Sequence, residues 1–483
     1  MQVPRLTGGN GVKKILASTI MTQPYDHTVD EALSAALAKA KRKIVVLDDD
    51  PTGVQTVHNV PVYTTWTTEA ITSGFADESP VFFILTNSRG MPAVETEIVH
   101  RDIGIKICAV SRDTGKDFIV VSRSDSTLRG HFPLETSTLR NAIESASSRR
   151  YNGEILLPFF QEGGRYTIEN IHYVRDAELL IPAGETEFAH DTSFGYASSH
   201  LGEYVEEKTA GSFKKESCAY ISLEDLRSGD LRQVAATLEH VNNFDKVIVN
   251  ATDYLDVKRF AISYLFALSN GHEFIFRSAA AVPKVLGGIT DRPLLSRNDI
   301  IDPANQNGGI IIIGSHVNKT TNQFEELLSC RVPLNYVQFD QHCIAEDGGL
   351  EQETKRVTAL ASESIVAGKN VVIFTRRERY NAPTDNPAEL LAVSTRISDA
   401  LVGVIANLVV QPNFIIAKGG ITSSDVGVKA LGVKRAVVMG QISPGVPVWM
   451  TGPESKFPGM PFVIFPGNVG EDCALRDIVD CIS

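Results

Sequence analysis

The sequence predicts an α/β protein with two three-layer domains, each built on a mainly parallel sheet. Three observations support this prediction. Short, almost uninterrupted aliphatic runs alternate with stretches of helical periodicity, which is typical of strands buried on both faces of a sheet. Nearly every run ends in a cluster of polar residues. A segment rich in Pro, Asn and Gly, residues 302–309, separates a first set of runs from a second.

The first set of runs predicts five buried strands. Helical patterns lie between them, for example at residues 31–41 and 134–147. Because strand and helix patterns alternate, the strands are expected to pair in parallel with helices crossing over the sheet. The five strands are expected at residues 43–47, 81–85, 118–121, 154–157 and 246–249.

The carboxyl ends of these strands carry side chains suited to binding. In open α/β sheets, ligands bind just beyond the carboxyl ends of the strands. Polar loops follow strands in any protein, so a single cluster would mean little. Several clusters rich in Asp and Arg instead predict one shared binding edge. The clusters are Asp48–Asp50, Asn87–Arg89, Ser124–Arg129 and Gln161–Arg165.

The second set of runs predicts a second α/β domain with glycine turns at its strand ends. Its strands are expected at residues 310–313, 370–374, 413–417 and 462–465. Linkers rich in Pro, Gly and Asn are common domain boundaries. We therefore divide the chain into an N-terminal extension, a first domain, a hinge and a second domain. These segments comprise residues 1–42, 43–285, 286–308 and 309–483.

Composition excludes several classes of protein. Of 483 residues, 43% are hydrophobic and 22% are charged, so the chain can bury a core and is not disordered. The formal net charge of −12 argues against nucleic acid or an anionic membrane as the main partner. Six cysteines without a CxxC pair predict neither a disulfide framework nor a zinc site. The absence of a signal-like or membrane-spanning run leads us to expect a cytoplasmic protein.

Two segments of the first domain contain residues that could carry chemistry. Three adjacent carboxylates at residues 48–50 could hold Mg²⁺ or accept a proton from a hydroxyl, although a solvated acidic turn is the alternative. The run 122–131 mixes arginines with hydroxyls and Asp125, which suits a small hydroxylated acid. Arg165 follows a Gly-Gly turn, although a lone arginine often forms only a surface ion pair.

The second domain offers turns that could bind anions. Glycine turns expose backbone N–H groups, and a following helix N-terminus favours negative charge. They occur at Gly314-Ser-His, Lys418–Asp425 and Pro466–Gly470. Ser423, Ser424 and Asp425 are also good helix caps, which would be a purely structural role. The chain lacks GxxxxGK[ST], GxGxxG, HExxH and GxSxG, so several familiar nucleotide-binding and hydrolase motifs are excluded.

An ordered set of these motifs resembles the four-carbon acid sugar kinases. Asp49-Asp-Pro-Thr-Gly53 is similar to that family's Asp-Asp-x-Thr-Gly opening. Its later motifs resemble residues 124–131, 158–165, 277–280, 314–315, 419–423 and 466–470. The likeness extends over residues 43–472, nearly the whole chain.

The resemblance implies an ATP-dependent kinase that phosphorylates a hydroxyl of threonate, erythronate or an oxo-tetronate. It implies an acid-sugar domain, a nucleotide domain and an active site in the cleft between them, with ATP and Mg²⁺ as cofactors. The catalytic residues would be Asp49 and Asp50. The acid would bind to Arg89, Ser124, Asp125, Arg129 and Arg165. The nucleotide would bind to Ser315, Gly419, Gly420, Ile421, Thr422, Ser423 and Gly467.

Two departures from the family pattern keep other interpretations open. Many members have Asp where this chain has Ile421, and Lys where it has Phe465. A non-catalytic sugar-acid sensor is therefore one alternative. A nicotinamide-dependent oxidoreductase is another, although the missing GxGxxG counts against it. The sequence leaves open the metal ligands, the stereoisomer used, which hydroxyl reacts, the choice of base between the two aspartates, any homo-oligomer and the role of residues 1–42.

Overall fold

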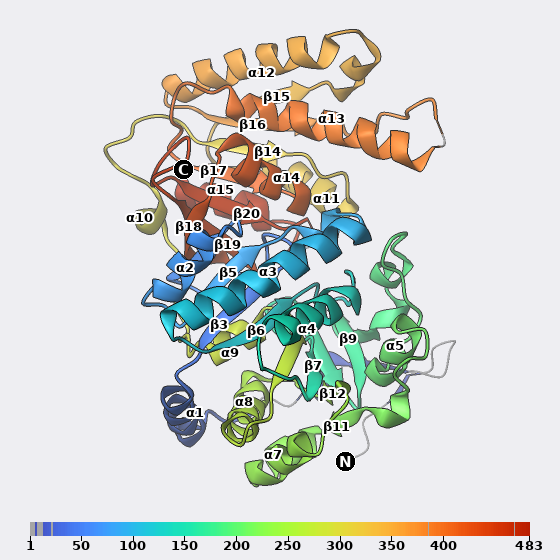
Figure 1. The fold of residues 1–483 in the computed structure, drawn as a ribbon. Coiled ribbons are helices and arrows are strands. Elements are labelled where there is room, and N and C mark those ends of the chain that lie inside the picture. Colours follow the sequence, from blue (N-terminus) through green and yellow to red (C-terminus); the bar gives the residue numbers. More distant parts are fainter. Residues whose placement is uncertain (1–4, 7–12, 21–22, 385, 468) are drawn as a thin grey trace. The chain divides into compact units, whose positions relative to one another are not determined.

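The computed structural model describes residues 5–6, 13–20, 23–384, 386–467 and 469–483 (Figure 1). The chain forms two compact units, each discontinuous in sequence. Unit 1 consists of Met1–Gly53 and Thr65–Asp291, and unit 2 of Val54–Thr64 and Arg292–Ser483. Both units are α/β with mainly parallel sheets, which confirms the predicted fold class.

The main sheet of unit 1 has the strand order β11-β12-β7-β13-β6-β3-β5, and every neighbouring pair is parallel. Its central strands are fully buried, because their aliphatic side chains are covered on both faces. The strands are β3 (Lys43–Asp48), β5 (Val81–Leu85), β6 (Phe118–Arg123), β7 (Gly153–Leu157), β11 (Ala219–Ile221), β12 (Asp245–Val249) and β13 (Phe274–Ser278).

Helices cover both faces of this sheet. The crossovers through α3 and α4 run along the sheet in one direction, and those through α7 and α8 run in the other. Because parallel crossovers are right-handed, the two pairs lie on opposite faces. Helices α3 and α4 pack together, as do α7 and α8 (Figure 1). The helices of unit 1 are α1 (His27–Ala40), α2 (Thr68–Ala76), α3 (Ala93–Thr114), α4 (Leu134–Ala146), α5 (Leu201–Lys208), α6 (Leu223–Arg227), α7 (Leu231–Glu239), α8 (Tyr254–Ser269) and α9 (Ala281–Leu286).

A second, antiparallel sheet of unit 1 has the order β1-β2-β10-β9-β8. It joins the start of the chain to the segment after the main-sheet strand β7, and α1 packs against α8. Residues 1–4, 7–12 and 21–22 of the expected N-terminal extension lie outside the described residues. The strands are β1 (Arg5–Leu6), β2 (Lys14–Leu16), β8 (Arg165–Ile168), β9 (Ile171–Asp176) and β10 (Leu179–Pro182).

The sheet of unit 2 has the order β4-β18-β19-β20-β17-β14-β16-β15. The five strands from β20 to β15 are parallel, whereas β4, β18 and β19 pair antiparallel. Strand β4, which comes early in the chain, thus pairs with a strand from the second half of the sequence. The strands are β4 (Val60–Tyr63), β14 (Ile310–Ile313), β15 (Leu334–Phe339), β16 (Asn370–Thr375), β17 (Ile415–Lys418), β18 (Arg435–Ser443), β19 (Val446–Thr451) and β20 (Pro461–Phe465).

Helices of unit 2 again form two groups. Helix α11 packs with α15, while α12 packs with α13 and α13 with α14 (Figure 1). Buried side chains of β14, β17, β20 and α15 form one continuous core. The helices are α10 (Arg297–Ile300), α11 (Asn318–Leu327), α12 (Gly349–Val366), α13 (Pro387–Ala406), α14 (Gly420–Asp425) and α15 (Ala474–Ile482), with a π-helical turn at Val426–Ala430. Across the described ranges, no helix has the length and apolar character needed to cross a bilayer.

Candidate functional site

The register of the unit 1 sheet aligns the carboxyl ends of four neighbouring strands. Asp48 of β3 is the Cα partner of Arg123 of β6, which in turn pairs with Ser278 of β13. Ser278 pairs with Leu157 of β7. The residues that follow these strands therefore gather along one edge of the sheet, as the sequence predicted.

Asp49 is the most highly connected carboxylate of this edge. Its two oxygens accept from Arg89, with Nη2 2.7 Å from Oδ1 and Nε 3.0 Å from Oδ2. Ser124 Oγ donates to Oδ2 at 2.9 Å, and Arg123 Nη1 lies 3.3 Å from Oδ1. Burial raises the pKa of Asp49 above its ordinary value, although Arg89 and Arg123 favour the charged form.

The two neighbouring aspartates have different surroundings. Arg123 Nη1 lies 3.0 Å from Asp48 Oδ1, yet burial raises the pKa of Asp48 to about 8. Asp50 accepts from Arg89 Nη1 at 2.7 Å and from the backbone N–H of Thr52. Burial opposes ionisation there, but Arg89, Arg123 and Thr52 together hold the pKa of Asp50 below its ordinary value. Asp49 thus has a higher proton affinity than a typical aspartate, and Asp50 a lower one.

The loop after β6 holds a second group of charges. Arg129 Nε donates to Asp125 Oδ2 at 2.6 Å, and Thr127 donates to the same oxygen. Against the effect of burial, Arg129 and Arg89 hold the pKa of Asp125 well below its ordinary value. Asp125 is therefore ionised and engaged with Arg129.

Arg165 lies at the start of β8, beside this loop. Its side chain is buried, and its Nε has no hydrogen-bond partner among the residues that the structure describes. Its guanidinium and that of Arg129 both lie over the Phe188 ring, 5.8 and 5.0 Å from the ring centroid. Burial lowers the pKa of Arg165; the negative charge of Asp125 opposes this effect, and the positive charge of Arg129 adds to it. A buried cation without an anionic partner is costly, so this position favours a bound anion.

Two residues of this edge, Arg277 and Ser278, were not among the predicted site residues. Arg277 Nη1 and Ser278 Oγ are buried without hydrogen-bond partners in the described part of the chain, although Arg277 Nη1 lies 3.6 Å from Glu135 Oε2 in an ion pair. Both border a small cavity together with Asp125 and Tyr204. Their position at the end of a strand was the signal that could have identified them, because Phe274-Ile-Phe276 is a strand-like run followed by Arg-Ser.

Gly130 provides space between these groups. Its φ of +115° suits glycine, and a Cβ there would lie 2.8 Å from Ser124 Oγ. The same point is 3.3 Å from Asp49 Oδ2 and 3.4 Å from Arg277 Nη2. A carboxylate, a hydroxyl and a guanidinium thus surround a position that a side chain would block. This combination suits a hydroxyl group of a ligand.

The sheet of unit 2 aligns its strand ends in the same way. Lys418 of β17 is the Cα partner of Ile313 of β14 on one side and of Phe465 of β20 on the other. The turns that follow these strands contain Ser315, Gly419 and Gly467. A Cβ at Gly419, where φ is +119°, would lie 3.0 Å from Ser315 Cβ, and one at Gly467 would lie 3.6 Å from Ser315 Oγ. The three turns therefore meet, which brings together Ser315, Gly419 and Gly467, residues that the family resemblance assigns to the nucleotide.

The residues after Gly419 do not all face this meeting point. Gly420 to Ser423 begin α14, and Ser423 Oγ donates to the Ala417 carbonyl at 2.8 Å. Thr422 is buried, and its Oγ1 lies 3.3 Å from the Cβ position of Gly419. Ile421, by contrast, is 73% exposed. Asn468, which belongs to the predicted 466–470 turn, lies outside the described residues.

Lys418 holds two of these turns together. Its Nζ is buried, donates to the Pro466 carbonyl and lies 3.9 Å from the centroid of the Phe465 ring. Burial lowers the pKa of Lys418 well below its ordinary value, and Lys319 adds to this effect. The position of Lys418 at the start of the Lys418–Asp425 turn did not indicate this role, because the role depends on a carbonyl 48 positions away.

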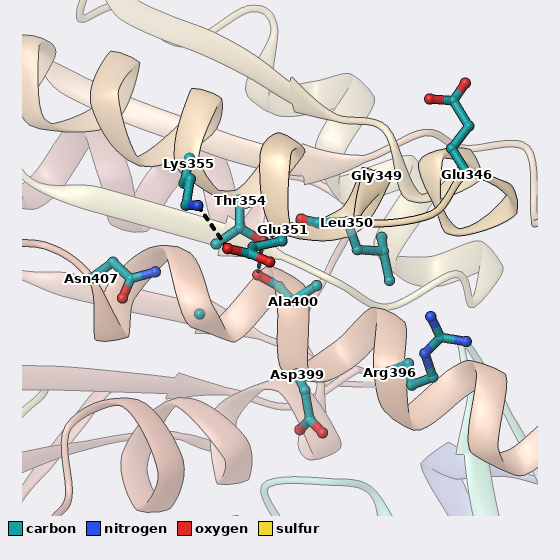
Figure 2. A pocket seen from close by; sticks show the side chains of 12 residues that line it. Glu346, Gly349, Leu350, Glu351, Thr354, Lys355, Arg396, Asp399, Ala400 and Asn407 are labelled. Atoms are coloured by element: carbon teal, nitrogen blue, oxygen red, sulfur yellow. Dashed lines mark hydrogen bonds and ion pairs between the residues drawn. The ribbon is translucent and has the colours of Figure 1, made fainter.

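A polar hollow of about 610 Å³ lies between α12 and α13 of unit 2 (Figure 2). None of the predicted site residues borders it. Several polar groups around it already have partners: Lys355 Nζ lies 2.7 Å from Glu351, and Thr354 Oγ1 donates to the Ala400 carbonyl at 2.9 Å. We therefore assign neither the expected sugar acid nor the expected nucleotide to this hollow.

The three adjacent aspartates at the carboxyl end of β3 are candidates for a metal site. Asp48, Asp49 and Asp50 supply oxygen atoms, but all three pair with Arg89 or Arg123. Within the described residues, no three His, Cys, Asp or Glu side chains are arranged to hold a metal ion. Mg²⁺ commonly uses one or two carboxylates together with substrate phosphates. The residues present therefore fit an ion that arrives with a nucleotide better than one held by protein side chains alone.

Comparison with solved structures supports the fold. The Haemophilus influenzae protein HI1011 is 16% identical, with a TM-score of 0.58 over 91% of this chain and 100% of that one. A Salmonella typhimurium LT2 protein with the provisional name tRNA synthase is also 16% identical, with a TM-score of 0.62 over 90% of this chain and 98% of that one. A search of curated proteins found no match.

Family models match both halves of the chain. A sugar-binding N-terminal domain matches residues 44–286, and a nucleotide-binding C-terminal domain matches residues 310–475. The first range contains the Asp–Arg edge of unit 1, and the second contains the glycine turns of unit 2. With a sugar-binding domain followed by a nucleotide-binding domain, the chain belongs to the four-carbon acid sugar kinase family.

Proposed function

We propose that the protein is an ATP-dependent kinase that phosphorylates a hydroxyl group of a four-carbon sugar acid, such as threonate, erythronate or an oxo-tetronate. The observation that carries this proposal is the edge of unit 1. There, a buried aspartate of raised pKa lies on the same edge as Arg165, which forms no ion pair within the described residues. The aspartate suits an acceptor hydroxyl, and the arginine suits a carboxylate. A sugar acid contains both groups.

Arg165 is the proposed partner of the substrate carboxylate. Its guanidinium has no carboxylate within ion-pair distance in the described part of the chain, whereas Arg129 already pairs with Asp125. A planar guanidinium can bind a carboxylate through two parallel hydrogen bonds. Arg129, Ser124 and Asp125 would then shape the site for the remaining substrate oxygens.

Asp49 is the proposed proton acceptor. A general base works best when its pKa lies close to the operating pH, and burial shifts the pKa of Asp49 in that direction. The pKa of Asp50 is instead lowered, so Asp50 stays ionised and anchors Arg89. Arg89, bonded to both carboxylates, would keep the base in place and balance its charge.

The proposed reaction forms one bond and breaks another. The substrate hydroxyl oxygen attacks the γ-phosphorus of ATP, its proton passes to Asp49, and the bond from the γ-phosphorus to the β,γ-bridging oxygen breaks, which releases ADP. Such transfers depend chiefly on positioning and on neutralising the phosphate charge. Backbone N–H groups at Ser315 and Gly467 would contact the phosphates, whereas the N–H of Gly419 donates to the Phe465 carbonyl at 2.8 Å and fixes the turn. Gly420, Ile421, Thr422 and Ser423 form the start of the adjoining helix. Mg²⁺, when bound together with the nucleotide, would neutralise part of the phosphate charge.

An assay of acid-dependent ADP release tests the proposal. Purified protein with Mg²⁺ and ATP should release ADP when a four-carbon sugar acid is added, and much less when the matching neutral four-carbon polyol is added instead. A protein stabilised against heat by a tetronate but not by ATP would instead behave as a sensor.

A further inference from the structure

A half-buried arginine, Arg377, lies beside the glycine turns of unit 2. Strand β16 lies next to β14, and Phe374 of β16 is the Cα partner of Ile313. The loop after β16 therefore runs alongside the turn that contains Ser315. Arg377 Nη2 donates to the Ser315 carbonyl at 2.9 Å and to Thr321 Oγ1 at 2.7 Å.

The rest of this guanidinium has no partner. Arg377 Nε and Nη1 are buried and make no hydrogen bond within the described residues, and no carboxylate there forms an ion pair with them. The neighbouring Arg376 differs, because it pairs with Asp340 at 3.4 Å and with Glu378 at 3.3 Å. Arg377 thus holds a positive charge with three free N–H bonds, whereas the adjacent cation is neutralised.

The surroundings of Arg377 add positive charge, and no carboxylate among the described residues forms an ion pair with it. Burial and the nearby Arg379 both lower the pKa of Arg377, and this outweighs the opposite effect of Glu325. Arg377 and Arg379 likewise lower the pKa of His316, after burial. A partly desolvated cation in such surroundings is stabilised by an incoming anion.

We propose that Arg377 binds a phosphate group of the nucleotide at the point where the turns of Ser315, Gly419 and Gly467 meet. Arg377 lies outside all the sequence motifs described above. Its Nη2 fixes the Ser315 turn, and its remaining N–H bonds are free to donate to phosphate oxygens. This proposal rests on the proposed function, since it assigns a further residue to the nucleotide site.

Isothermal titration calorimetry with ATP, ADP and adenosine tests this assignment. Loss of charge-assisted hydrogen bonds should make the Arg377→Ala variant bind ATP and ADP about tenfold to a hundredfold more weakly, while adenosine binding stays within about twofold. The matched control is Arg376→Ala, which removes the same charge from the next residue and should leave all three affinities unchanged. Thr321→Val removes a partner of Nη2 without removing the guanidinium, and it should have only a small effect.

The possible outcomes separate the two proposals. If wild-type protein binds ATP and Arg377→Ala binds it equally well, Arg377 is not a phosphate ligand and the proposed function stands. If Arg377→Ala weakens ATP, ADP and adenosine by the same factor, the arginine only supports the loop, and the phosphate assignment is wrong. If wild-type protein binds none of the three, the proposed function itself fails, and this assignment fails with it.

Discussion

Arg89 donates a hydrogen bond to each oxygen of Asp49, with its Nη2 2.7 Å from Oδ1 and its Nε 3.0 Å from Oδ2. The same guanidinium reaches Asp50 through Nη1 at 2.7 Å. One arginine therefore fixes two adjacent carboxylates whose pKa values move in opposite directions. Pairs of groups with separated pKa values commonly divide acid–base roles in active sites. This division makes the two aspartates experimentally distinguishable.

Asp49→Asn and Asp50→Asn form a matched pair, since each removes one carboxylate bound to Arg89. If Asp49 accepts the proton, Asn at that position should lower kcat by about 10²- to 10⁴-fold. The KM for ATP should change little, because the proposed contacts to ATP come from other residues. Asp50→Asn should lower kcat by roughly tenfold or less, because it only loosens Arg89. Steady-state ADP release measures both, and a near-normal kcat for Asp49→Asn would remove Asp49 from the role of base.

Replacement of Arg165 should separate acid binding from stability. Arg165→Met keeps the length of the side chain but removes a buried charge that lacks an anionic partner. The KM for the acid should rise about tenfold to a hundredfold, while the KM for ATP stays constant. The melting temperature should not fall, because the unpaired buried cation is itself destabilising. The control Arg175→Gln alters an exposed arginine on β9 and should change neither the KM for the acid nor the melting temperature. An unchanged KM for the acid in Arg165→Met would contradict the assignment.

Gly130→Ala should block the space between Asp49, Ser124 and Arg277. The new methyl group would lie 2.8 Å from Ser124 Oγ, and φ at this position is +115°. Turnover with the sugar acid should fall by at least tenfold, and the free energy of unfolding should decrease by about 1–3 kcal/mol. Gly115→Ala is the control, since Gly115 also has a positive φ, +66°, but open space around its Cβ position. It should lose about 1 kcal/mol of stability and no activity. Equal loss of activity in both variants would show that the effect is not specific to the site.

His172 should make the fold of unit 1 sensitive to acid. The ring is fully buried, with Nε2 2.7 Å from the Ser126 carbonyl and Nδ1 3.1 Å from Thr167 Oγ1. Burial lowers its pKa from 6.5 to about 4. The unfolded chain binds the His172 proton more tightly than the folded chain does. His172 should therefore cost no stability above pH 6.5, and the free energy of unfolding should decrease as the pH drops from 6.5 towards 4. The loss between pH 7 and pH 5 should be about 2 kcal/mol.

Urea unfolding at pH 7 and pH 5 measures this loss. The His172→Gln variant has no group that titrates at this position, so its stability should change less between the two pH values than that of wild-type protein. His190→Gln replaces an exposed histidine and should retain the wild-type dependence. If His172→Gln lost as much stability on acidification as wild-type protein, another group would be responsible.

The parallel parts of the fold were predictable, because their strands are uniform runs. The run at residues 81–85 coincides with β5, and the run at residues 310–313 coincides with β14. The antiparallel strand β18 was missed because its buried and half-exposed residues alternate, so no continuous apolar run marks it. Strand β4 could not be placed either. Its partner β18 lies some 370 residues further along the chain, and no local pattern encodes such a pairing.

The candidate site was predictable in position but not in its connections. Strand ends located Asp49, Arg89 and Ser124 correctly along one edge, because parallel strands bring their carboxyl ends together. Which arginines are free depends on tertiary contacts. Nothing in the sequence distinguishes Arg129 from Arg165, yet Asp125 forms an ion pair with Arg129, whereas Arg165 has no carboxylate within ion-pair distance among the described residues. Arg377 was overlooked for the same reason, since its neighbours come from a different strand end.

Acid-dependent release of ADP across a panel of four-carbon sugar acids tests the central claim most directly. The panel should contain both threonate and erythronate enantiomers, the oxo-tetronates and the corresponding neutral polyols, each with Mg²⁺ and ATP. We expect at least one acid to give stoichiometric ADP and a phosphorylated product, and we expect Asp49→Asn to abolish most of that release. Failure of every acid to raise ADP release above the rate without acceptor, with protein that binds ATP, would contradict the account.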